Sequence, residues 1–421
     1  MREMKDSGIE WIGAIPQDWK TDRLQWHLKE INVSNNPIQT KNILSLTIEA
    51  GVIPYAEKGN QGNKAKEDYS QYKIALPDTL VINSMNVIIG AVGISQYFGC
   101  VSPVYYVFEP IEGTDLRYIY YLFTNTGFQK EMRKYAKGIL EIRLRISSND
   151  MLKRIVPSPP FKEQQRIADY LDKMCAEIDA VLEKTRASIE EYKKLKQAVI
   201  TQAVTKGIRG DRPMKNSGSV WFEEIPCNWV MKRIKYLFHI KKDIAGKEGY
   251  TVLSITQSGI KPKDLSKNEG QLADNYSHYQ LLNPGDFAMN HMDLLTGWVD
   301  ISKYSGVTSP DYRVFVLDDT EKNDSSYYLY LMQMCYFNRI FYGLGQGVSG
   351  MGRWRLQADK FMNFPVVVPP VDEQKEIVSY LNEKCKQLDT LIRNKQQYLI
   401  EIENYKKSLI YEYVTGKKEV V

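Results

Sequence analysis

The sequence predicts an α+β protein with two globular domains, each followed by a long helix, and the two helices pairing as an antiparallel coiled coil with pseudo-twofold symmetry. Three observations support this prediction. Two stretches open with a pair of prolines and then continue for more than 40 residues without proline or glycine, as one long helix would. Motifs of the first half of the chain recur 210 residues later. Short β-branched and aromatic runs, separated by glycine, proline and asparagine, precede each long stretch and are typical of strands.

The long helices are expected at 159–207 and 369–416. Apolar residues recur along each of them at alternating steps of four and three, which is the spacing of a coiled-coil seam. A helix with one apolar stripe needs a partner in water, and the second copy supplies it. Polar residues within the row weaken the pairing but help to fix its register. The residues expected to pair the helices are Ile167, Leu171, Ile178, Val181, Tyr192, Leu195, Ile377, Leu381, Leu388, Leu391, Tyr398, Ile402 and Leu409.

The repeat is wider than the helices. The opening Met4–Gly8 returns in similar form at Met214–Gly218. We therefore predict globular domains at 1–158 and 216–368, joined through a linker at 208–215, with a short tail at 417–421. Four tryptophans also repeat, and we expect them to pack in the domain cores or against the helices: Trp11, Trp19, Trp221 and Trp229.

Inside the domains the repeat is weaker but persists with small shifts, which require insertions or deletions in loops. Strands are expected at Leu80–Ile82, Val104–Phe108 and Tyr312–Val316. Helices are expected at Leu116–Tyr135 and Tyr327–Tyr342.

The composition excludes several classes of protein. Hydrophobic residues make up 43% and charged residues 25% of the 421-residue chain, as in ordinary soluble proteins. No apolar run approaches the ~18 residues of a membrane span, and the first residues do not resemble a signal peptide. The five cysteines are scattered and only four histidines are present, so we do not expect a zinc site. The same cysteine pattern leads us to expect that the protein resides in a reducing cytoplasm. A net charge of +5 permits a local nucleic-acid patch without requiring one.

Two motifs favour an enzyme at first sight. Ser158–Phe161 fits a loop that holds the target amine in amino-methyltransferases, and Phe341–Gly345 fits their glycine loop for S-adenosylmethionine. The repeat of the first motif, Val368–Val371, has lost both informative ends, and a proline start to a long helix explains both copies. The glycine motif follows a helix-like stretch, whereas a cofactor loop should follow a buried strand. A fused methyltransferase therefore stays the weaker alternative, and a coiled-coil scaffold without a DNA role is a third.

Polar runs at matching places in the two domains favour DNA binding. Lysine neutralises phosphates, and asparagine and glutamine bind adenine edges through two hydrogen bonds. Arginine binds phosphate or guanine, although a surface pair holding the domain to its helix would have the same sequence. A plain solvated loop would also have this composition. The candidates are Lys58, Asn60, Gln61, Asn63, Lys64, Lys66, Tyr69, Tyr72, Arg143 and Arg145 in the first domain, and Gln257, Lys261, Lys263, Asn275, Tyr276, Tyr279, Arg353 and Arg355 in the second.

The repeated motifs resemble one known family. Each half opens with K-[DN]-S-G-x-x-W followed by I-P-x-x-W, starts its helix with P-P-x-x-E-Q-x-x-I, and ends it at Val-Thr with a nearby glycine. This arrangement resembles the specificity subunit of type I restriction–modification enzymes over nearly the whole chain. The second opening, Asn216–Trp221, is less typical of the family than Asp6–Trp11, and Lys384 replaces the Met174 of the first helix.

The resemblance implies a function in DNA recognition. Each globular part would be a target recognition domain that reads one half of a bipartite double-stranded DNA site. The helices would space these domains and dock two methylation subunits, which carry S-adenosylmethionine and methylate adenine. A separate motor–nuclease subunit cleaves unmodified DNA in the family. The resemblance implies no catalytic centre, no cofactor and no metal in this chain.

Overall fold

The structure is a computed structural model that describes residues 2–59, 65, 68–85, 91–138, 144–264, 275–347 and 354–420. The chain divides into two compact units, and each is described by itself. Unit 1 comprises Met1–Arg186 and Gln397–Val421, and unit 2 comprises Ala187–Gln396. Each unit therefore contains one globular part and a segment of both long helices, so the unit boundaries fall within the helices and not between the two copies of the repeat. The domain boundaries expected from the repeat remain a prediction.

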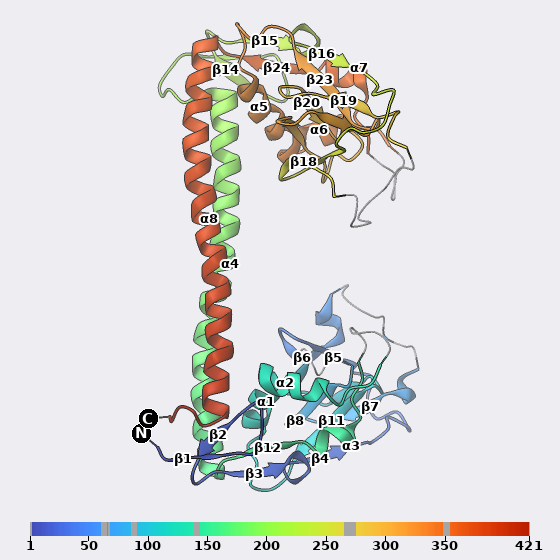
Figure 1. Ribbon diagram of the computed structural model, residues 1–421, viewed down its shortest axis with the longest axis vertical. Helices are drawn as coiled ribbons and strands as arrows, with labels where there is room; N and C mark the ends of the chain where they lie inside the picture. Colours follow the sequence, from blue (N-terminus) through green and yellow to red (C-terminus); the bar gives the residue numbers. More distant parts are fainter. Residues whose placement is uncertain are drawn as a thin grey trace. The chain divides into compact units, whose positions relative to one another are not determined.

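Unit 1 is built from short strands, short helices and parts of both long helices (Figure 1). Its elements are β1 (Met4–Asp6), β2 (Ala14–Pro16), β3 (Lys20–Arg23), β4 (Leu28–Ile31), β5 (Leu44–Thr47), β6 (Gly51–Pro54), β7 (Lys73–Ala75), β8 (Thr79–Asn83), β9 (Val92–Ser95), β10 (Gly99–Val101), β11 (Tyr105–Pro110), α1 (Leu116–Thr124), α2 (Thr126–Arg133), α3 (Ser148–Leu152), β12 (Ile155–Ser158) and the first part of α4 (Phe161–Lys206).

Unit 2 has the same kinds of element in the same order. They are β13 (Met214–Asn216), β14 (Glu224–Pro226), β15 (Val230–Arg233), β16 (Phe238–Lys241), β17 (Leu253–Thr256), β18 (Gly259–Pro262), β19 (Gln280–Leu282), β20 (Phe287–Met289), β21 (Val299–Ile301), β22 (Gly306–Thr308), β23 (Arg313–Leu317), α5 (Ser325–Phe337), α6 (Ile340–Gly343), α7 (Ala358–Met362), β24 (Pro365–Val368) and the first part of α8 (Val371–Val414).

The sheets show that the two units share one topology. Unit 1 has an antiparallel four-stranded sheet in the order β4-β11-β8-β9, and unit 2 has the equivalent order β16-β23-β20-β21. The two-stranded ladders also correspond, with β3–β12 in unit 1 matched by β15–β24 in unit 2. This ladder leads directly into the long helix, so it joins the helix start to the sheet region of its own domain.

Each four-stranded sheet is buried on both faces. In β8, Leu80 and Ile82 face the larger core with the helices, whereas Val81 faces a smaller core against the β5–β6 and β7–β10 ladders. In β20, Phe287 and Ala288 divide between the two cores in the same way. This alternation follows from the two-residue period of a strand.

The expected helix Leu116–Tyr135 is two helices in the structure. Asn125 has an extended backbone between α1 and α2, and its side chain accepts hydrogen bonds from two backbone N–H groups at the start of α2. The expected helix Tyr327–Tyr342 is likewise divided into α5 and α6, at the left-handed Arg339. Neither break contains proline or glycine, so the chain has no strong sequence signal there.

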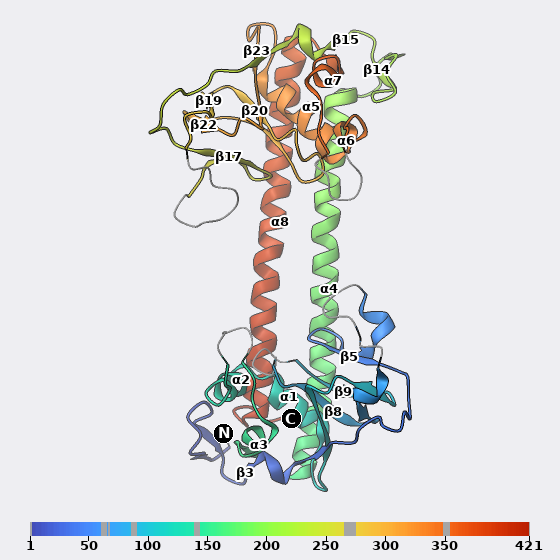
Figure 2. The same ribbon diagram turned by 90° about the vertical axis from the view of Figure 1, so that its right-hand side faces the viewer.

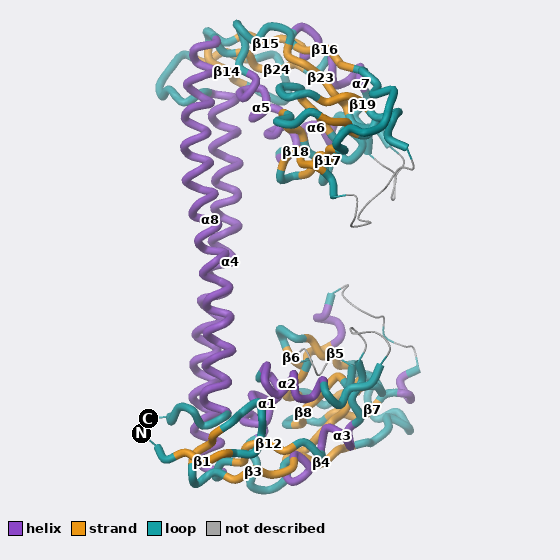
Figure 3. Tube along the Cα trace, in the orientation of Figure 1, coloured by secondary structure: helices purple, strands orange, loops and turns teal. Residues whose placement is uncertain are grey.

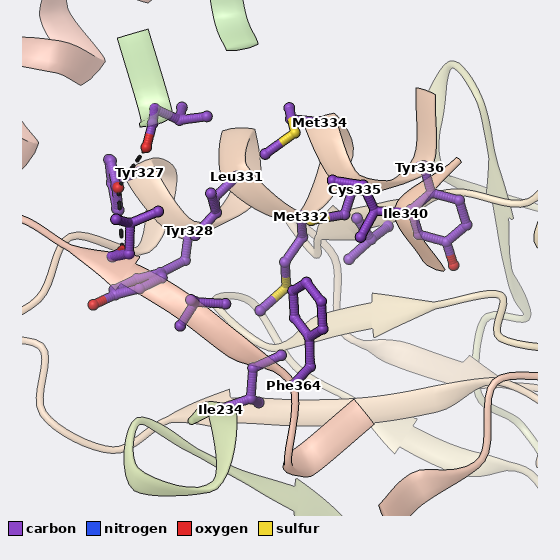
Figure 4. Packing of buried hydrophobic residues seen from close by; sticks show 14 of the residues in the cluster. Ile234, Tyr327, Tyr328, Leu331, Met332, Met334, Cys335, Tyr336, Ile340 and Phe364 are labelled. Carbon is purple, nitrogen blue, oxygen red and sulfur yellow. Dashed lines mark hydrogen bonds between the residues drawn. The ribbon is translucent and has the colours of Figure 1, made fainter. Parts of the chain in front are cut away.

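A buried tyrosine anchors the helices to each globular part. The hydroxyl of Tyr327 donates to the carbonyl oxygens of Val204, near the end of α4, and Val367, in β24 (3.0 and 3.2 Å; Figure 4). In unit 1 the hydroxyl of Tyr118 makes the matching bonds to Val414 and Pro157 (2.9 and 3.3 Å). The end of each long helix is thus held by the globular part of the unit in which it lies.

The glutamine near the start of each long helix joins the helix to its globular part. Gln164 accepts from the backbone N–H of Asp115, the residue that caps α1, and donates to the carbonyl of Pro159 (both 2.9 Å). Gln374 makes the equivalent bonds in unit 2 (both 2.8 Å). These buried amides fix the direction in which each long helix leaves its domain.

The long helices are uninterrupted and pair antiparallel within each unit (Figure 3). In unit 1, the beginning of α4 packs against the end of α8, including a ring contact of 4.5 Å between Tyr170 and Tyr413. In unit 2, the end of α4 packs against the beginning of α8. Trp19 and Trp229 are fully buried, and Trp11 and Trp221 pack against the cores, so the expected role of the four tryptophans is confirmed.

Two equivalent ion pairs connect the helices. Lys406 binds Asp179 in unit 1 at 2.6 Å, and Lys196 binds Asp389 in unit 2 at 2.7 Å. Each pair lies partly in solvent, where ion pairs contribute little to stability. The ion pairs help to fix the register of the two helices, because a shift of one helix along the other would separate both pairs.

The pairing face differs in part from the expected one. Ile167, Leu171, Ile178, Ile377, Leu381, Leu388 and Leu409 are buried as expected, and Tyr192 and Ile402 are half-buried. Val181, Leu195, Leu391 and Tyr398 are 40–48% exposed, so their expected place in the seam is wrong. The row instead passes through Leu182 and Ile189, and through the half-buried Ile392 and Leu399. The reason is that two apolar rows lie one residue apart, and spacing alone does not distinguish them.

The corrected face can be tested with neighbouring substitutions. We expect Leu182→Ala to lower the free energy of unfolding of unit 1 by about 2 kcal/mol, because it leaves a cavity in a buried contact. Val181→Ala should change it by less than about 0.5 kcal/mol, because that side chain already lies partly in water. Urea denaturation of the two variants measures the difference, and a larger loss for Val181→Ala would restore the original face.

Both termini belong to unit 1 and lie close together in two views (Figures 1 and 2). Lys417 donates from its ammonium group to the carbonyl of Ala14, and Val420 packs against the core of unit 1. None of the helices in the described part of the chain combines the length and the hydropathy that a membrane span requires.

Candidate nucleic-acid interface

Arg145 and Arg355 occupy equivalent places in the two units. Arg145 exchanges two backbone hydrogen bonds with Lys137 (2.8 and 2.9 Å), and Arg355 exchanges two with Gln346 (2.9 and 3.0 Å). Both arginine side chains are exposed. Each guanidinium is therefore presented by a short two-stranded bridge, as an exposed group that binds phosphate or a base edge would be.

The residue after each arginine ties this bridge to the central sheet. Ile146 donates its backbone N–H to the carbonyl of Ser84 (3.2 Å), just after β8. Leu356 donates in the same way to His291 (2.9 Å), just after β20. The exposed arginines thus lie beside the loops that follow the central strands β8 and β20, and the structure brings these separate segments together.

The polar run of unit 1 is described only in part. Lys58 ends a short 3₁₀ helix, and its ammonium lies 5.3 Å from the centre of the Tyr55 ring. Tyr69 begins another 3₁₀ turn, capped by the carboxylate of Asp68, and is half-buried. Both residues remain candidates on a partly exposed surface.

Tyr72 does not fit the expected role. Only 6% of the residue is exposed, and its backbone carbonyl accepts from the N–H of Asn35 at 2.9 Å. The side chain is therefore buried within the domain, so its expected place among the DNA-binding residues is wrong. In a polar run, an aromatic residue next to a strand has more to gain from burial than its polar neighbours.

In unit 2 the candidates surround an open cavity of about 760 Å³. Lys261 and Lys263 line it from the end of β18 and just beyond, and Tyr279 lines it from the residue before β19. Burial raises the pKa of the Tyr279 hydroxyl, so it is a neutral hydrogen-bonding group at ordinary pH. Asn290 and Tyr312, which the sequence did not single out, complete this set of polar and aromatic groups.

The other described candidates of unit 2 do not line the cavity and make contacts of their own. The amide of Gln257 donates to the carbonyl of Thr296 at 3.3 Å. The side chain of Asn275 accepts from the backbone N–H of Ser277 at 2.7 Å. Tyr276 meets the ring of Tyr279 edge to face at 4.9 Å. Asn275 is thus used to shape a turn, although it remains exposed.

The remaining candidates lie outside the residues that the structure describes, and they stay predictions. They are Asn60, Gln61, Asn63, Lys64, Lys66, Arg143 and Arg353.

The two motifs that resemble methyltransferase loops, Phe341–Gly345 and Ser158–Phe161, are explained by packing and hydrogen bonding within the fold. Phe341 is buried in the core of unit 2, and a side chain at Gly343 would meet the ring of Trp221 at 3.2 Å. A side chain at Gly345 would meet the indole of Trp354 at 2.4 Å. The glycines therefore make room for tryptophan rings. Pro159 in the other motif accepts the Gln164 bond at the start of α4.

A family model for the type I restriction modification DNA specificity domain matches residues 16–191 and 226–404. The chain is 26% identical over 321 residues to the type I restriction enzyme MjaVIII specificity subunit of Methanocaldococcus jannaschii, which covers 73% of this chain and 71% of that protein. The two matches to the family model fall on the two copies of the repeat.

Solved structures show the same fold. A chain from a structural study of the assembly and conformational transition of the type I R-M system matches with a TM-score of 0.71 and 14% identity, over 96% of this chain and 99% of that one. The HsdS subunit of Thermoanaerobacter tengcongensis matches with a TM-score of 0.52 and 13% identity, over 96% and 98%. At these identities the likeness concerns the fold alone.

Proposed function

Because the chain belongs to the type I restriction–modification DNA specificity family, we propose that it selects the DNA site for a methylation complex, with each unit reading one half of a bipartite sequence. The observation that carries the proposal is that one topology occurs twice with different polar groups at equivalent places. The shared frame suits a common task, holding a duplex. The differing groups suit unequal half-sites, since base edges give specificity and phosphate contacts give position.

We propose that the chemistry comes from partner subunits that carry S-adenosylmethionine. The packing of Trp221 and Trp354 on the glycine motif supports this part, because the motif has a structural explanation in this chain. The target adenine would leave the base stack and enter the partner's pocket.

Methylome sequencing tests the function. A strain that carries the methylation partner should show a bipartite methylated motif with this chain and lose it without the chain. Exchanging residues 58–72 for those of a related protein should alter the first half of the motif only. Exchanging an exposed turn remote from the candidates, such as 319–322, is the control and should leave the motif intact. A motif that persists without the chain would refute the proposal.

The exposed apolar row of the helices supports two docking sites for methylation subunits. Leu195 and Leu391 lie in unit 2, and their repeat equivalents, Tyr405 and Val181, lie in unit 1. All four are 40–52% exposed. Each comes just before a residue that contacts the other helix, namely the seam residues Leu182 and Ile392 or the ion-paired Lys196 and Lys406. Antiparallel pairing brings such positions of both helices to the same side. Each unit therefore offers one equivalent apolar pair, which supports one partner subunit per unit.

Glutamate substitutions test this docking. Leu195→Glu with Leu391→Glu should weaken binding of one methylation subunit by at least about tenfold, because two apolar contacts are lost. The same change at Val181 and Tyr405 should remove the other. Native mass spectrometry should then show one partner copy for each double variant and none for the quadruple variant. Lys194→Glu, on an exposed position outside the row, is the matched control. Two bound partners in the quadruple variant would place the docking surface elsewhere.

A further inference from the structure

Arg313 is a charged side chain buried beside the candidate interface of unit 2. It is the first residue of β23 and pairs with Met289 of β20. Only 6% of it is exposed, its guanidinium donates to the carbonyl of Leu356 at 2.8 Å, and it lies 5.0 Å from the centre of the Phe361 ring. No carboxylate of the described residues forms an ion pair with it. Burying a cation without such a partner is costly, so the position needs an explanation.

Unit 1 shows that the fold does not need a charge there. Its equivalent residue is Tyr106, whose hydroxyl donates to the carbonyl of Ile146 at 3.1 Å. Ile146 is the repeat equivalent of Leu356, so a neutral ring makes the same connection. Unit 1 has a half-buried cation nearby, Lys73, whose pKa is lowered by burial and raised in part by the charge of Glu30. Unit 2 has isoleucine at the place of that glutamate, Ile240.

The surroundings of Arg313 add positive charge. Leu356, which accepts its hydrogen bond, follows the exposed Arg355 and donates to the carbonyl of His291. Burial, followed by the opposing effects of Tyr336 and Arg355, lowers the pKa of Arg313 to about 10, so it remains charged at neutral pH. The charge of Asp359 acts in the opposite direction and raises this pKa, but it does not outweigh burial.

His291 is the third basic residue of this cluster. Its Nδ1 is buried without a partner in the described structure. Burial and the two arginines lower the pKa of His291 to about 4, so the ring is neutral and the charge of the cluster rests on the two guanidinium groups.

We propose that Arg313 and Arg355 form a seat for one phosphodiester group of DNA in unit 2, with Arg355 making the contact and Arg313 acting as a positioning residue through its charge. A phosphate would add negative charge near Arg313, which forms no ion pair with a carboxylate among the described residues. Arg355 has the exposure needed to reach the strand, and the Leu356 connection holds the two arginines in one arrangement. The inference rests on the proposed function, because it assumes that this face of unit 2 meets DNA.

The test is the salt dependence of DNA affinity for the complex of this chain with its methylation subunits. Each phosphate contact contributes about −0.9 to the slope of log affinity against log salt. Arg355→Gln should reduce the magnitude of the slope by about one and leave folding unchanged, since the side chain is exposed. Arg313→Tyr copies unit 1 and should keep the fold while weakening binding about fivefold at low salt, the order expected for one partly screened charge. Lys322→Gln, in an exposed turn of unit 2, controls for loss of charge alone.

A second pair of variants separates charge from shape. Arg313→Lys should keep most of the affinity, whereas Arg313→Gln should lose it to the same extent as Arg313→Tyr. Arg313→Tyr with unchanged affinity and slope would make the arginine structural and overturn the inference. A changed half-site in the methylome of Arg355→Gln would overturn the phosphate contact in favour of base reading. If the wild-type complex binds no specific DNA, the proposed function itself fails. If it binds and these variants bind equally well, only this inference fails.

Discussion

Duplicating four residues in the middle of each long helix is expected to lengthen the unread spacer of the DNA site by one or two base pairs, with both half-sites unchanged. Four helical residues add about 6 Å, and one base pair occupies about 3.4 Å of a duplex. The segments to duplicate are Glu183–Arg186 and Arg393–Gln396, because they end at the two unit boundaries and are repeat equivalents. The new residues therefore add length while leaving the contacts of each unit intact.

The seam should accept this insertion. Four residues rotate a helix by about 40° beyond a full turn, and coiled coils accommodate such an insertion by local unwinding. Both helices must receive it, because an insertion in one alone would separate the Lys196–Asp389 pair from the Lys406–Asp179 pair in register. The single-helix variants should therefore lose specific binding rather than change the spacer.

Methylome sequencing would measure the spacer directly. Four residues inserted between Thr320 and Glu321, in an exposed turn of unit 2, provide the control and should leave the spacer unchanged. A double insertion that altered a half-site, or that left the spacer at its original length, would show that the helices do not set the spacing.

The sequence predicted those features of the fold that depend on residues close together in the chain, and it missed those that depend on distant contacts. The long helices were predictable because proline pairs mark their starts and no helix breaker follows until their ends. The burial of Trp19 and Trp229 was predictable from their repeat. The phase of the seam was not, because Val181 and Leu182 are both apolar and only the packed partner helix distinguishes them. The helix break at Asn125 was also missed, since its cap competes with a continuous apolar pattern.

For the candidate interface too, composition identified some residues correctly, whereas features that depend on distant contacts were missed. Composition led to Lys261, Lys263 and Tyr279, which the structure brings to one cavity. It could not separate Tyr72, which is buried, from its polar neighbours, because burial depends on contacts distant in sequence. Arg313 was missed for the same reason. The signal was present, since aligning Ser309-Pro310 with Ser102-Pro103 places Arg313 opposite Tyr106, but its meaning needed the burial of both.

Replacing Glu373 by glutamine is expected to lower the free energy of unfolding of unit 2 by about 3 kcal/mol, the range for breaking a buried ion pair. Glu373 is 2% exposed, lies in the first turn of α8, and forms an ion pair with Arg212. It also accepts from the indole N–H of Trp229 at 2.8 Å. Arg212 in turn donates to the carbonyl of Lys206 at the end of α4 (2.8 Å), so one carboxylate joins both helices to the globular part.

Unit 1 provides the matched control. Glu163 occupies the equivalent place and pairs with Arg2, but Arg2 also binds Asp18 at 2.7 Å. The indole N–H of Trp19 makes no hydrogen bond in the described structure, whereas that of Trp229 does. In Glu163→Gln, Arg2 would therefore remain paired with Asp18, and no indole N–H would lose a hydrogen bond. We expect this substitution to lower the free energy of unfolding of unit 1 by about 1 kcal/mol. Equal losses for the two variants would mean that the Trp229 bond and the lone pairing of Arg212 contribute nothing.

The pH dependence of this difference follows from the sign of the pKa shift. Burial alone would raise the pKa of Glu373, but the bonds from Trp229 and Arg212 outweigh it and hold the pKa below its ordinary value. A carboxyl with a lowered pKa in the folded state stabilises the fold at pH values above its unfolded pKa of about 4.3. That contribution is lost as the pH falls through the lower, folded pKa. The gap between wild type and Glu373→Gln should thus be constant from pH 7 to about 5 and shrink below about pH 4, because other carboxylates titrate alike in both proteins. Urea denaturation at several pH values measures the gap, and a gap that widened in acid would mean that Glu373 is stabilised in its protonated form.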